Sequence, residues 1–272
     1  MRRYGQHFLV CQEVRDSIVD AAAPGPRDLV LEIGPGKGAL TAKLAERAGM
    51  VVAVEIDGHL VEALQKAFAG RAGVRIVHAD VLECDIARLA READFEAGRR
   101  LVVANLPYCI TSPVLRQLLA NSLLFDEFVL MVQMEVAERL VAGPGESGRS
   151  VLSLMAQYHT EPSLVMRVGP ECFQPPPAVD SAVVRLKVRK RPAVDADPRT
   201  LWALVEAGFK HRRKTMRNAV YALLPPGCGA DLIDRAFHDA DVDPRLRAEH
   251  MSLDQFSALA DAVNALFAAC SR

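Results

Sequence analysis

Short apolar runs alternate with helical patterns along the first two-thirds of the chain. Five runs are rich in branched apolar residues and are typical of buried strands, at 29–33, 51–56, 74–78, 101–105 and 128–132. Helical patterns such as those at 38–48 and 59–68 lie between them. Strands that are apolar along their whole length need cover on both faces, which crossover helices on a parallel sheet provide. Right-handed crossovers then predict a doubly wound α/β fold with a mostly parallel sheet.

The pattern changes after about Gly148. A helical stretch at 150–158 precedes two strand-like segments at 164–168 and 181–188, which are separated by the proline-rich residues 173–177. Residues 191–198 have the composition of a linker. Beyond them the pattern is helical, with a Pro-Pro-Gly break at 225–227 and helices expected at 199–209, 212–224, 231–238 and 252–267. We therefore predict an α/β domain at 1–190 and a small all-helical domain at 191–272.

Composition excludes several classes of protein. No apolar stretch reaches about eighteen residues, so no membrane span is predicted, and the N-terminal residues lack the apolar run of a secretory signal. We therefore expect a cytoplasmic protein. The six cysteines form no C-x-x-C pair and the seven histidines do not cluster with them, so we expect reduced thiols and no structural metal. The absence of a long heptad pattern favours a monomer.

A glycine-rich segment, Gly34-Pro35-Gly36-Lys37-Gly38, follows the first predicted strand. Glycines here let the backbone turn sharply and let a ligand approach closely. Glu55 ends the second strand, where a carboxylate can accept hydrogen bonds from ribose hydroxyls. Asp80 follows the third strand and can accept a hydrogen bond from an adenine amino group. Together these residues predict a nucleoside cofactor, with NAD and S-adenosylmethionine both open at this point.

The segment Asn105-Leu106-Pro107-Tyr108 ends the fourth strand and therefore projects into the same crevice. The exocyclic amine of adenine is a poor nucleophile because its lone pair is delocalised into the ring. The Asn105 side-chain oxygen and the Leu106 carbonyl can accept hydrogen bonds from the N6 amino group and so favour a localised lone pair. Pro107 stiffens the turn, and Tyr108 offers a face for base stacking, at roughly 1–3 kcal/mol per base.

These features favour methylation of adenine over hydride transfer. A sulfonium methyl donor makes a strong general base unnecessary, so catalysis rests on alignment and electrostatics. A Tyr-x-x-x-Lys pair for hydride transfer needs a lysine at position 112, where Ser112 stands. An ordinary turn after the strand is the alternative interpretation of residues 105–108, and their position beside the glycine segment favours the chemical one.

The region from Arg185 to Arg217 contains eleven basic and three acidic residues on a chain of net charge −1. Such a segment is typical either of a solvated basic face or of a surface for a polyanion. Helical spacing places Lys210, Lys214 and Arg217 on one face, with Arg213 beside them. Taken alone, the basic segment favours the solvated face.

At this point the sequence resembles a known family, the KsgA/RsmA type of bacterial small-subunit rRNA adenine N6,N6-dimethyltransferase. The similarity runs from Gly5-Gln6-His7-Phe8-Leu9 to Glu249-His250-Met251-Ser252. Between these ends, the blocks that carry it are the glycine segment, 54–57, 105–108, 141–145, 173–184 and 211–218. The resemblance implies a Rossmann-like class I methyltransferase domain at 1–190 and a helical RNA- or ribosome-binding domain at 191–272. In that domain it favours phosphate contacts from the basic residues Lys210, Arg212, Arg213, Lys214 and Arg217.

The resemblance also implies roles for individual residues. S-adenosylmethionine is expected to bind to His7, Leu9, Gly34, Gly36, Glu55, Asp80 and Asn105. Glu55 holds its ribose, Asp80 its adenine, and Asn105 lies between cofactor and target. Phe173 is expected to stack on the target adenine opposite Tyr108, although Phe173 and Leu9 taken singly are typical of core residues.

The implied substrate is a pair of adjacent adenosines in the hairpin near the 3′ end of 16S rRNA. Each receives two methyl groups on N6 while the small ribosomal subunit is being assembled. Two alternatives stay open: an RNA- or ribosome-binding assembly factor without turnover, and a large-subunit rRNA methyltransferase that confers antibiotic resistance. The second shares the crevice but usually lacks the block at 211–218.

Overall fold

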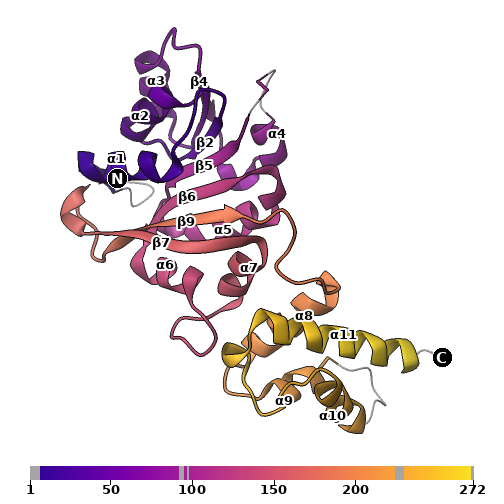
Figure 1. The fold of residues 1–272 in the computed structure, drawn as a ribbon. Coiled ribbons are helices and arrows are strands. Elements are labelled where there is room, and N and C mark those ends of the chain that lie inside the picture. Colours follow the sequence, from indigo (N-terminus) through magenta and orange to yellow (C-terminus); the bar gives the residue numbers. More distant parts are fainter. Residues whose placement is uncertain (1–6, 92–94, 97, 224–229, 271–272) are drawn as a thin grey trace. The chain divides into compact units, whose positions relative to one another are not determined.

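The computed structural model describes residues 7–91, 95–96, 98–223 and 230–270 (Figure 1). The break at 225–227, Cys228 and the first residues of the N-terminal motif, Gly5 and Gln6, lie outside this range. The chain divides into two compact units. The sheet unit contains the residues up to Glu138 and His159–Lys190, and the helical unit contains Arg139–Tyr158 and the residues from Arg191 onward.

A seven-stranded sheet organises the sheet unit, in the order β4-β3-β2-β5-β6-β9-β7 (Figure 1). Its first five strands are parallel, and β9 runs antiparallel to both β6 and β7. The predicted doubly wound, mostly parallel sheet is therefore confirmed. The strands are β2 (Leu29–Ile33), β3 (Met50–Glu55), β4 (Val74–His78), β5 (Arg100–Asn105), β6 (Glu127–Gln133), β7 (Thr160–Val168) and β9 (Ser181–Val188).

Helices flank the sheet and complete its core. Ile18 of α1 and Leu44 of α2 are fully buried against apolar strand residues such as Val30 and Val103. Each such side chain stabilises the fold by about 1.5–3 kcal/mol. Asp57 caps α3 by accepting a hydrogen bond from the His59 backbone. The helices are α1 (Gln12–Ala22), α2 (Ala39–Arg47), α3 (Gly58–Ala67), α4 (Ile86–Ala90), α5 (Thr111–Ala120) and α6 (Met134–Val141), which ends in the helical unit.

A second, two-stranded sheet ties the N-terminal segment to the proline-rich segment. Strand β1 (Phe8–Leu9) pairs antiparallel with β8 (Phe173–Gln174), with Leu9 opposite Phe173. The Val10 amide extends this contact by donating to the Cys172 carbonyl at 2.8 Å. No repeating pattern predicts strands of two residues, because they are defined by their partner rather than by their own composition.

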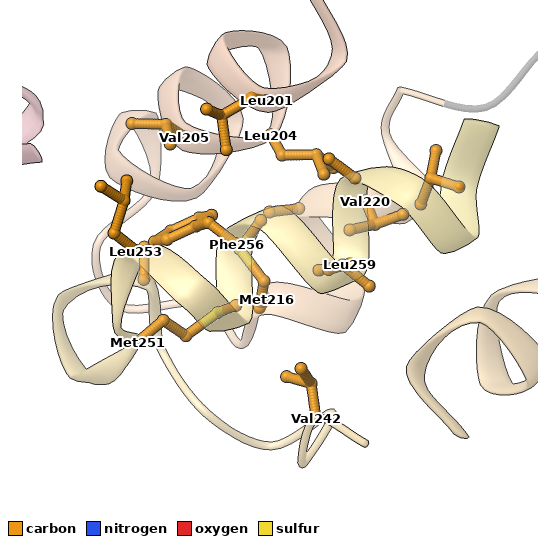
Figure 2. Close-up of a cluster of buried hydrophobic side chains, with 14 of the residues drawn as sticks. Leu201, Leu204, Val205, Met216, Val220, Val242, Met251, Leu253, Phe256 and Leu259 are labelled. Carbon is orange, nitrogen blue, oxygen red and sulfur yellow. The ribbon is translucent and has the colours of Figure 1, made fainter. Parts of the chain in front are cut away.

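The helical unit has its own hydrophobic core (Figure 2). Phe256 and Leu259 of α11 are fully buried together with Leu204 of α8 and Val220 of α9. These apolar residues recur at helical spacing, which is why the sequence predicts helices in this unit. The helix expected at 212–224 is shorter than predicted and contains only residues 216–221. The helices are α7 (Val151–His159), α8 (Pro198–Lys210), α9 (Met216–Tyr221), α10 (Ala230–Asp239) and α11 (Leu253–Cys270).

The division into units differs from the predicted domain boundaries in one respect. Residues 139–158 belong to the helical unit, not to the α/β domain. The Gly145 amide donates to the Glu249 carbonyl at 2.8 Å, and Leu154 and Tyr158 are part of the helical core. These contacts join segments about a hundred residues apart, so no local pattern signals them.

Arg149 is the main polar link within this arrangement. Its side chain is 1% exposed. One terminal nitrogen donates to the Ala142 carbonyl at 2.7 Å, and the other donates to the Met251 carbonyl at 3.0 Å. Burial lowers the pKa of the guanidinium, and these carbonyls, the Gln157 side-chain oxygen at 3.3 Å and the Glu146 charge stabilise its charged form.

We expect Arg149→Met to destabilise the helical unit by about 2–3 kcal/mol, because it leaves buried carbonyls without their charged donor. Chemical denaturation followed by circular dichroism measures the change. Arg245→Met is the matched control, since Arg245 is 87% exposed and pairs only with the neighbouring Asp243. Equal denaturation midpoints for Arg149→Met and the wild type would show that Arg149 does not stabilise the helical unit.

Candidate functional site

A cavity of about 440 Å³ lies in the sheet unit where β2, β3 and β5 end and where the chain leaves β4. This is the edge at which open α/β sheets bind ligands. The N-terminal segment 7–10 forms a further wall. The cavity brings together ten residues that the sequence predicts at the site: His7, Leu9, Gly34, Gly36, Glu55, Asp80, Asn105, Leu106, Pro107 and Tyr108.

The glycine segment turns beside the cavity in a conformation that other residues rarely adopt. Gly36 has a φ of +59°, and a Cβ atom there would lie 3.2 Å from the Phe8 ring. Both its backbone angle and this close contact therefore favour glycine. The turn directs the Gly36 amide at the Glu55 carboxylate, to which it donates at 3.1 Å.

Glu55 is the most fully hydrogen-bonded acid of the site. Its side chain is 3% exposed and accepts from the amides of Gly36, Ile56 and Asp57 at 3.0–3.1 Å. A carboxylate offers about four acceptor positions. One position therefore remains for a ligand hydroxyl, and the three amides hold the carboxylate in place to receive it.

Asp80 is positioned by the turn that follows β4. One carboxylate oxygen caps the short helix at Val81–Glu83 by accepting from the Leu82 amide at 2.9 Å. The side chain is half-buried and lines the cavity. The second oxygen is the one that can accept a hydrogen bond from a ligand amine.

Asn105 and the two residues after it form the wall at the end of β5. The Asn105 side-chain nitrogen donates to the His7 carbonyl at 3.4 Å, which orients the amide. Leu106 is 1% exposed, and its amide donates to the Met131 carbonyl at 3.1 Å. The Pro107 carbonyl accepts from the Thr111 hydroxyl at 3.0 Å. The wall is therefore rigid before any ligand arrives.

Tyr108 is held by contacts at its hydroxyl and on one face. Its hydroxyl hydrogen-bonds with the Ser181 hydroxyl at 2.6 Å, and burial raises the pKa of the phenol. The His7 ring stacks on Tyr108 with the ring centres 5.5 Å apart and the planes at 29°. His7 is itself hydrogen-bonded to the Pro175 carbonyl at 2.8 Å. A base that stacks on Tyr108 therefore uses the other face or replaces His7.

Phe173 does not lie where the resemblance to the family places it. Its side chain is 3% exposed and packs in the core with Leu9, Val168 and Val183, and it is not one of the residues that line the cavity. The pairing of β8 with β1 sets this orientation. In this structure the Phe173 side chain is in the core and not in the cavity opposite Tyr108. The structure therefore agrees with the interpretation of Phe173 as a core residue.

Glu32 is a cavity residue that none of the sequence motifs singles out. It lies within β2, is 1% exposed, and one of its carboxylate oxygens has no hydrogen-bond partner in the described residues. Burial raises the pKa of Glu32 to about 8, and the Glu55 carboxylate adds to the shift. The sequence does contain a signal for Glu32, because it is an acid within an otherwise apolar strand. Burying a carboxylate oxygen without a hydrogen-bond partner destabilises the fold, so such a residue is unusual.

The basic segment does not form the continuous helical face that the sequence predicts. Helix α8 ends at Lys210, residues 211–214 form a turn, and α9 begins at Met216. The Met216 amide donates to the distant Leu246 carbonyl, which starts α9 in a new direction. The prediction that Lys210, Lys214 and Arg217 share one helical face is therefore wrong.

The basic residues also differ in how far their charge is available. Lys210, Arg212, Arg213 and Lys214 are exposed. Arg217 instead forms a two-point salt bridge with Asp234, at 2.6 and 3.0 Å. Arg212 is held by a hydrogen bond to the Arg149 carbonyl at 3.1 Å and lies 5.9 Å from the centre of the Phe209 ring.

The fold and the cavity together define a Rossmann-like class I methyltransferase, a class that requires a methyl-donor cofactor. Solved structures agree. A dimethyladenosine transferase from Plasmodium falciparum is 25% identical, with a TM-score of 0.81 over 96% of this chain and 98% of that one. The 23S rRNA methyltransferase ErmE is 26% identical, with a TM-score of 0.71 over 94% of this chain and 99% of that one.

The family follows from sequence comparison. The ribosomal RNA adenine dimethylase family matches residues 1–264. Proteins called ribosomal RNA small subunit methyltransferase A are similar: that of Moorella thermoacetica is 44% identical and that of Pelotomaculum thermopropionicum 45%. Each alignment covers 94% of this chain and 89% of the relative. The chain belongs to the ribosomal RNA adenine dimethylase family.

Two further features concern membranes and metals. The described residues contain no helix that is both long and apolar enough to cross a membrane. Within the same residues, no three His, Cys, Asp or Glu side chains are grouped as a metal-binding site requires.

Glu32 makes the stability of the protein depend on pH. Its folded pKa of about 8 lies above its ordinary value of 4.5, so the folded state holds a proton that the unfolded chain releases. We therefore expect the free energy of unfolding to fall between these two pH values in the wild type, relative to Glu32→Gln. Urea denaturation at about pH 5 and pH 8 measures this difference.

Glu62→Gln is the control for this experiment, because Glu62 is exposed on α3. It is expected to show the wild-type pH dependence. The same dependence in Glu32→Gln would mean that Glu32 is not the group that holds the proton.

Proposed function

We propose that the protein transfers methyl groups from S-adenosylmethionine to N6 of two adjacent adenosines in the 3′-terminal hairpin of 16S rRNA. The observation that carries this proposal is the placement of Asn105-Leu106-Pro107-Tyr108 on the wall of the same cavity as Glu55 and Asp80. Family membership and the relatives called small subunit methyltransferase A support the substrate. The reaction belongs to small-subunit assembly, which takes place in the cytoplasm, and we infer that a monomer performs it.

The residues of the cavity fit this cofactor. A volume of about 440 Å³ is in the range of small-molecule sites. Glu55 accepts from a ribose hydroxyl and Asp80 from the adenine amine, while the glycine segment, His7 and Leu9 enclose the rest. When bound, S-adenosylmethionine supplies an electrophilic methyl group on a positively charged sulfur.

The protein's part in the reaction is alignment. The Asn105 oxygen and the Leu106 carbonyl accept hydrogen bonds from the N6 amino group of the target, which favours a localised lone pair on nitrogen. The contacts of Leu106 and Pro107 fix these acceptors in advance. Tyr108 supports the base by stacking. The target adenine leaves its own stack to reach this wall, which is easiest in a hairpin loop.

The helical unit contributes RNA contacts in this proposal. The exposed cations Lys210, Arg212, Arg213 and Lys214 bind phosphates, and Arg217 contributes less because Asp234 compensates its charge. Recognition of the hairpin rests on its shape and its unpaired bases, as is usual for RNA.

A large-subunit rRNA methyltransferase is the second candidate, because the chain is similar in structure to the 23S rRNA methyltransferase ErmE. The relatives at 44–45% identity and the block at 211–218 favour the small subunit. Mapping of N6-methylated adenines in both ribosomal RNAs distinguishes the two candidates.

The central test uses labelled S-adenosylmethionine and small subunits from a strain that lacks this modification. We expect label on N6 of two adjacent adenosines in the 3′-terminal hairpin. We also expect Asn105→Ala to reduce turnover by at least about a hundredfold, as loss of a preorganised polar contact does in other enzymes. Absence of label in the hairpin would refute the proposal.

The same variant separates catalysis from assembly. Cells that tolerate Asn105→Ala but not deletion of the gene would indicate that binding to the subunit is the essential role. Equal growth defects would indicate that methylation itself is required. The folded state of Asn105→Ala is checked by its melting temperature and by its affinity for RNA.

We expect the double substitution Arg213→Ala and Lys214→Ala to weaken RNA binding. The log–log dependence of affinity on salt should become shallower by roughly 0.7–0.9 for each phosphate that the variant no longer neutralises. Titrations at several salt concentrations measure both quantities. Arg235→Ala is the control, because Arg235 is exposed on α10 and pairs with Asp239. An unaltered slope in the double variant would place the RNA surface elsewhere.

A further inference from the structure

Two basic side chains line the cavity without a role in the mechanism so far. Among the described residues around it, Arg15 and Lys37 are the only lysine or arginine side chains. Arg15 comes from α1, and Lys37 follows Gly36 in the glycine segment. The acids that line the cavity are Glu55, Asp80 and Glu32, and burial raises the pKa of Glu32 to about 8.

Both cations are held by the N-terminal segment. Arg15 donates to the carbonyls of Leu9 and Val10 at 3.3 and 3.2 Å. The Lys37 ammonium lies 4.9 Å from the centre of the Phe8 ring, within the range of a cation–π contact. Three consecutive residues, Phe8 to Val10, therefore position two positive charges at the cavity.

Neither cation forms a salt bridge within the described part of the chain. The next lysine along the sequence provides a contrast, because Lys43 of α2 pairs with Asp16 at 2.9 Å. Arg15 is half-buried. A positioned guanidinium without a carboxylate partner, at a cavity that is also lined by a second cation, is suited to bind an anionic group.

The distribution of charge indicates which anion this is. The acids lie on the strand ends β2 and β3 and after β4, where the adenosine part of the cofactor is proposed to bind. The other end of S-adenosylmethionine is an amino acid whose carboxylate needs a cationic partner. We propose that Arg15 and Lys37 bind this carboxylate and so select a cofactor that carries it, an inference that rests on the cofactor of the proposed function.

The test compares two ligands that differ only in this group, S-adenosylmethionine and its decarboxylated form. Isothermal titration calorimetry gives both dissociation constants for the wild type, Arg15→Met, Lys37→Met and the double variant. We expect the double variant to bind S-adenosylmethionine about tenfold or more weakly than the wild type does, because one or two charge-assisted hydrogen bonds are removed. Its affinity for the decarboxylated ligand should change by less than about twofold.

Two further variants sharpen the comparison. Lys37→Arg keeps the charge and is expected to retain most of the preference for the carboxylate. Lys66→Met is the matched control, because Lys66 is exposed on α3 and does not line the cavity. Melting temperatures confirm that every variant is folded.

Several outcomes would overturn the inference. An equal loss of affinity for both ligands would mean that Arg15 and Lys37 act only by holding the N-terminal segment. Unchanged cofactor binding with weaker RNA binding and a shallower salt slope would assign the two cations to an RNA phosphate. In both cases the proposed function stands. A wild-type protein that binds neither ligand would refute the proposed cofactor, and this inference with it.

Discussion

The parallel pairing of β2 with β3 and β5 is the constraint on which the site depends. Leu29 lies opposite Met50 on one side and Arg100 on the other, so the three strands run in register. Their carboxyl ends therefore reach one edge of the sheet together. The glycine segment follows β2, Glu55 ends β3 and Asn105 ends β5. These residues meet in one cavity because backbone hydrogen bonds fix the register of the strands.

The two buried glutamates at this edge differ in the number of backbone amides that donate hydrogen bonds to them. Glu55 is surrounded by three amide donors, whereas Glu32, one strand away, has a carboxylate oxygen without a partner in the described residues. Burial therefore keeps Glu32 protonated to a higher pH while Glu55 is prepared for a ligand. Arg15 of α1 and Lys37 of the glycine segment, both held by residues 8–10, add two cations, so the lining of the cavity carries charges of both signs.

Local patterns predict the main strands and helices because apolar periodicity reflects burial in both secondary structure types. They also predict the cavity residues from Gly34 to Tyr108, since parallel strands bring their ends together whatever the loop lengths. They fail where the deciding contact is distant. The burial of Phe173 depends on β1, and the turn at 211–214 ends with Met216 bonded to Leu246. The inclusion of residues 139–158 in the helical unit depends on Met251 and Glu249.

The amino-acid order alone is therefore enough for the class of fold and for the residues that gather in the cavity at the carboxyl edge of the parallel strands. These properties depend on periodicity and on motifs that are contiguous in the chain. Folding in three dimensions decides which of those side chains remain available. His7 covers one face of Tyr108, Phe173 enters the core and Asp234 neutralises Arg217, because each contact joins parts of the chain that share no local pattern.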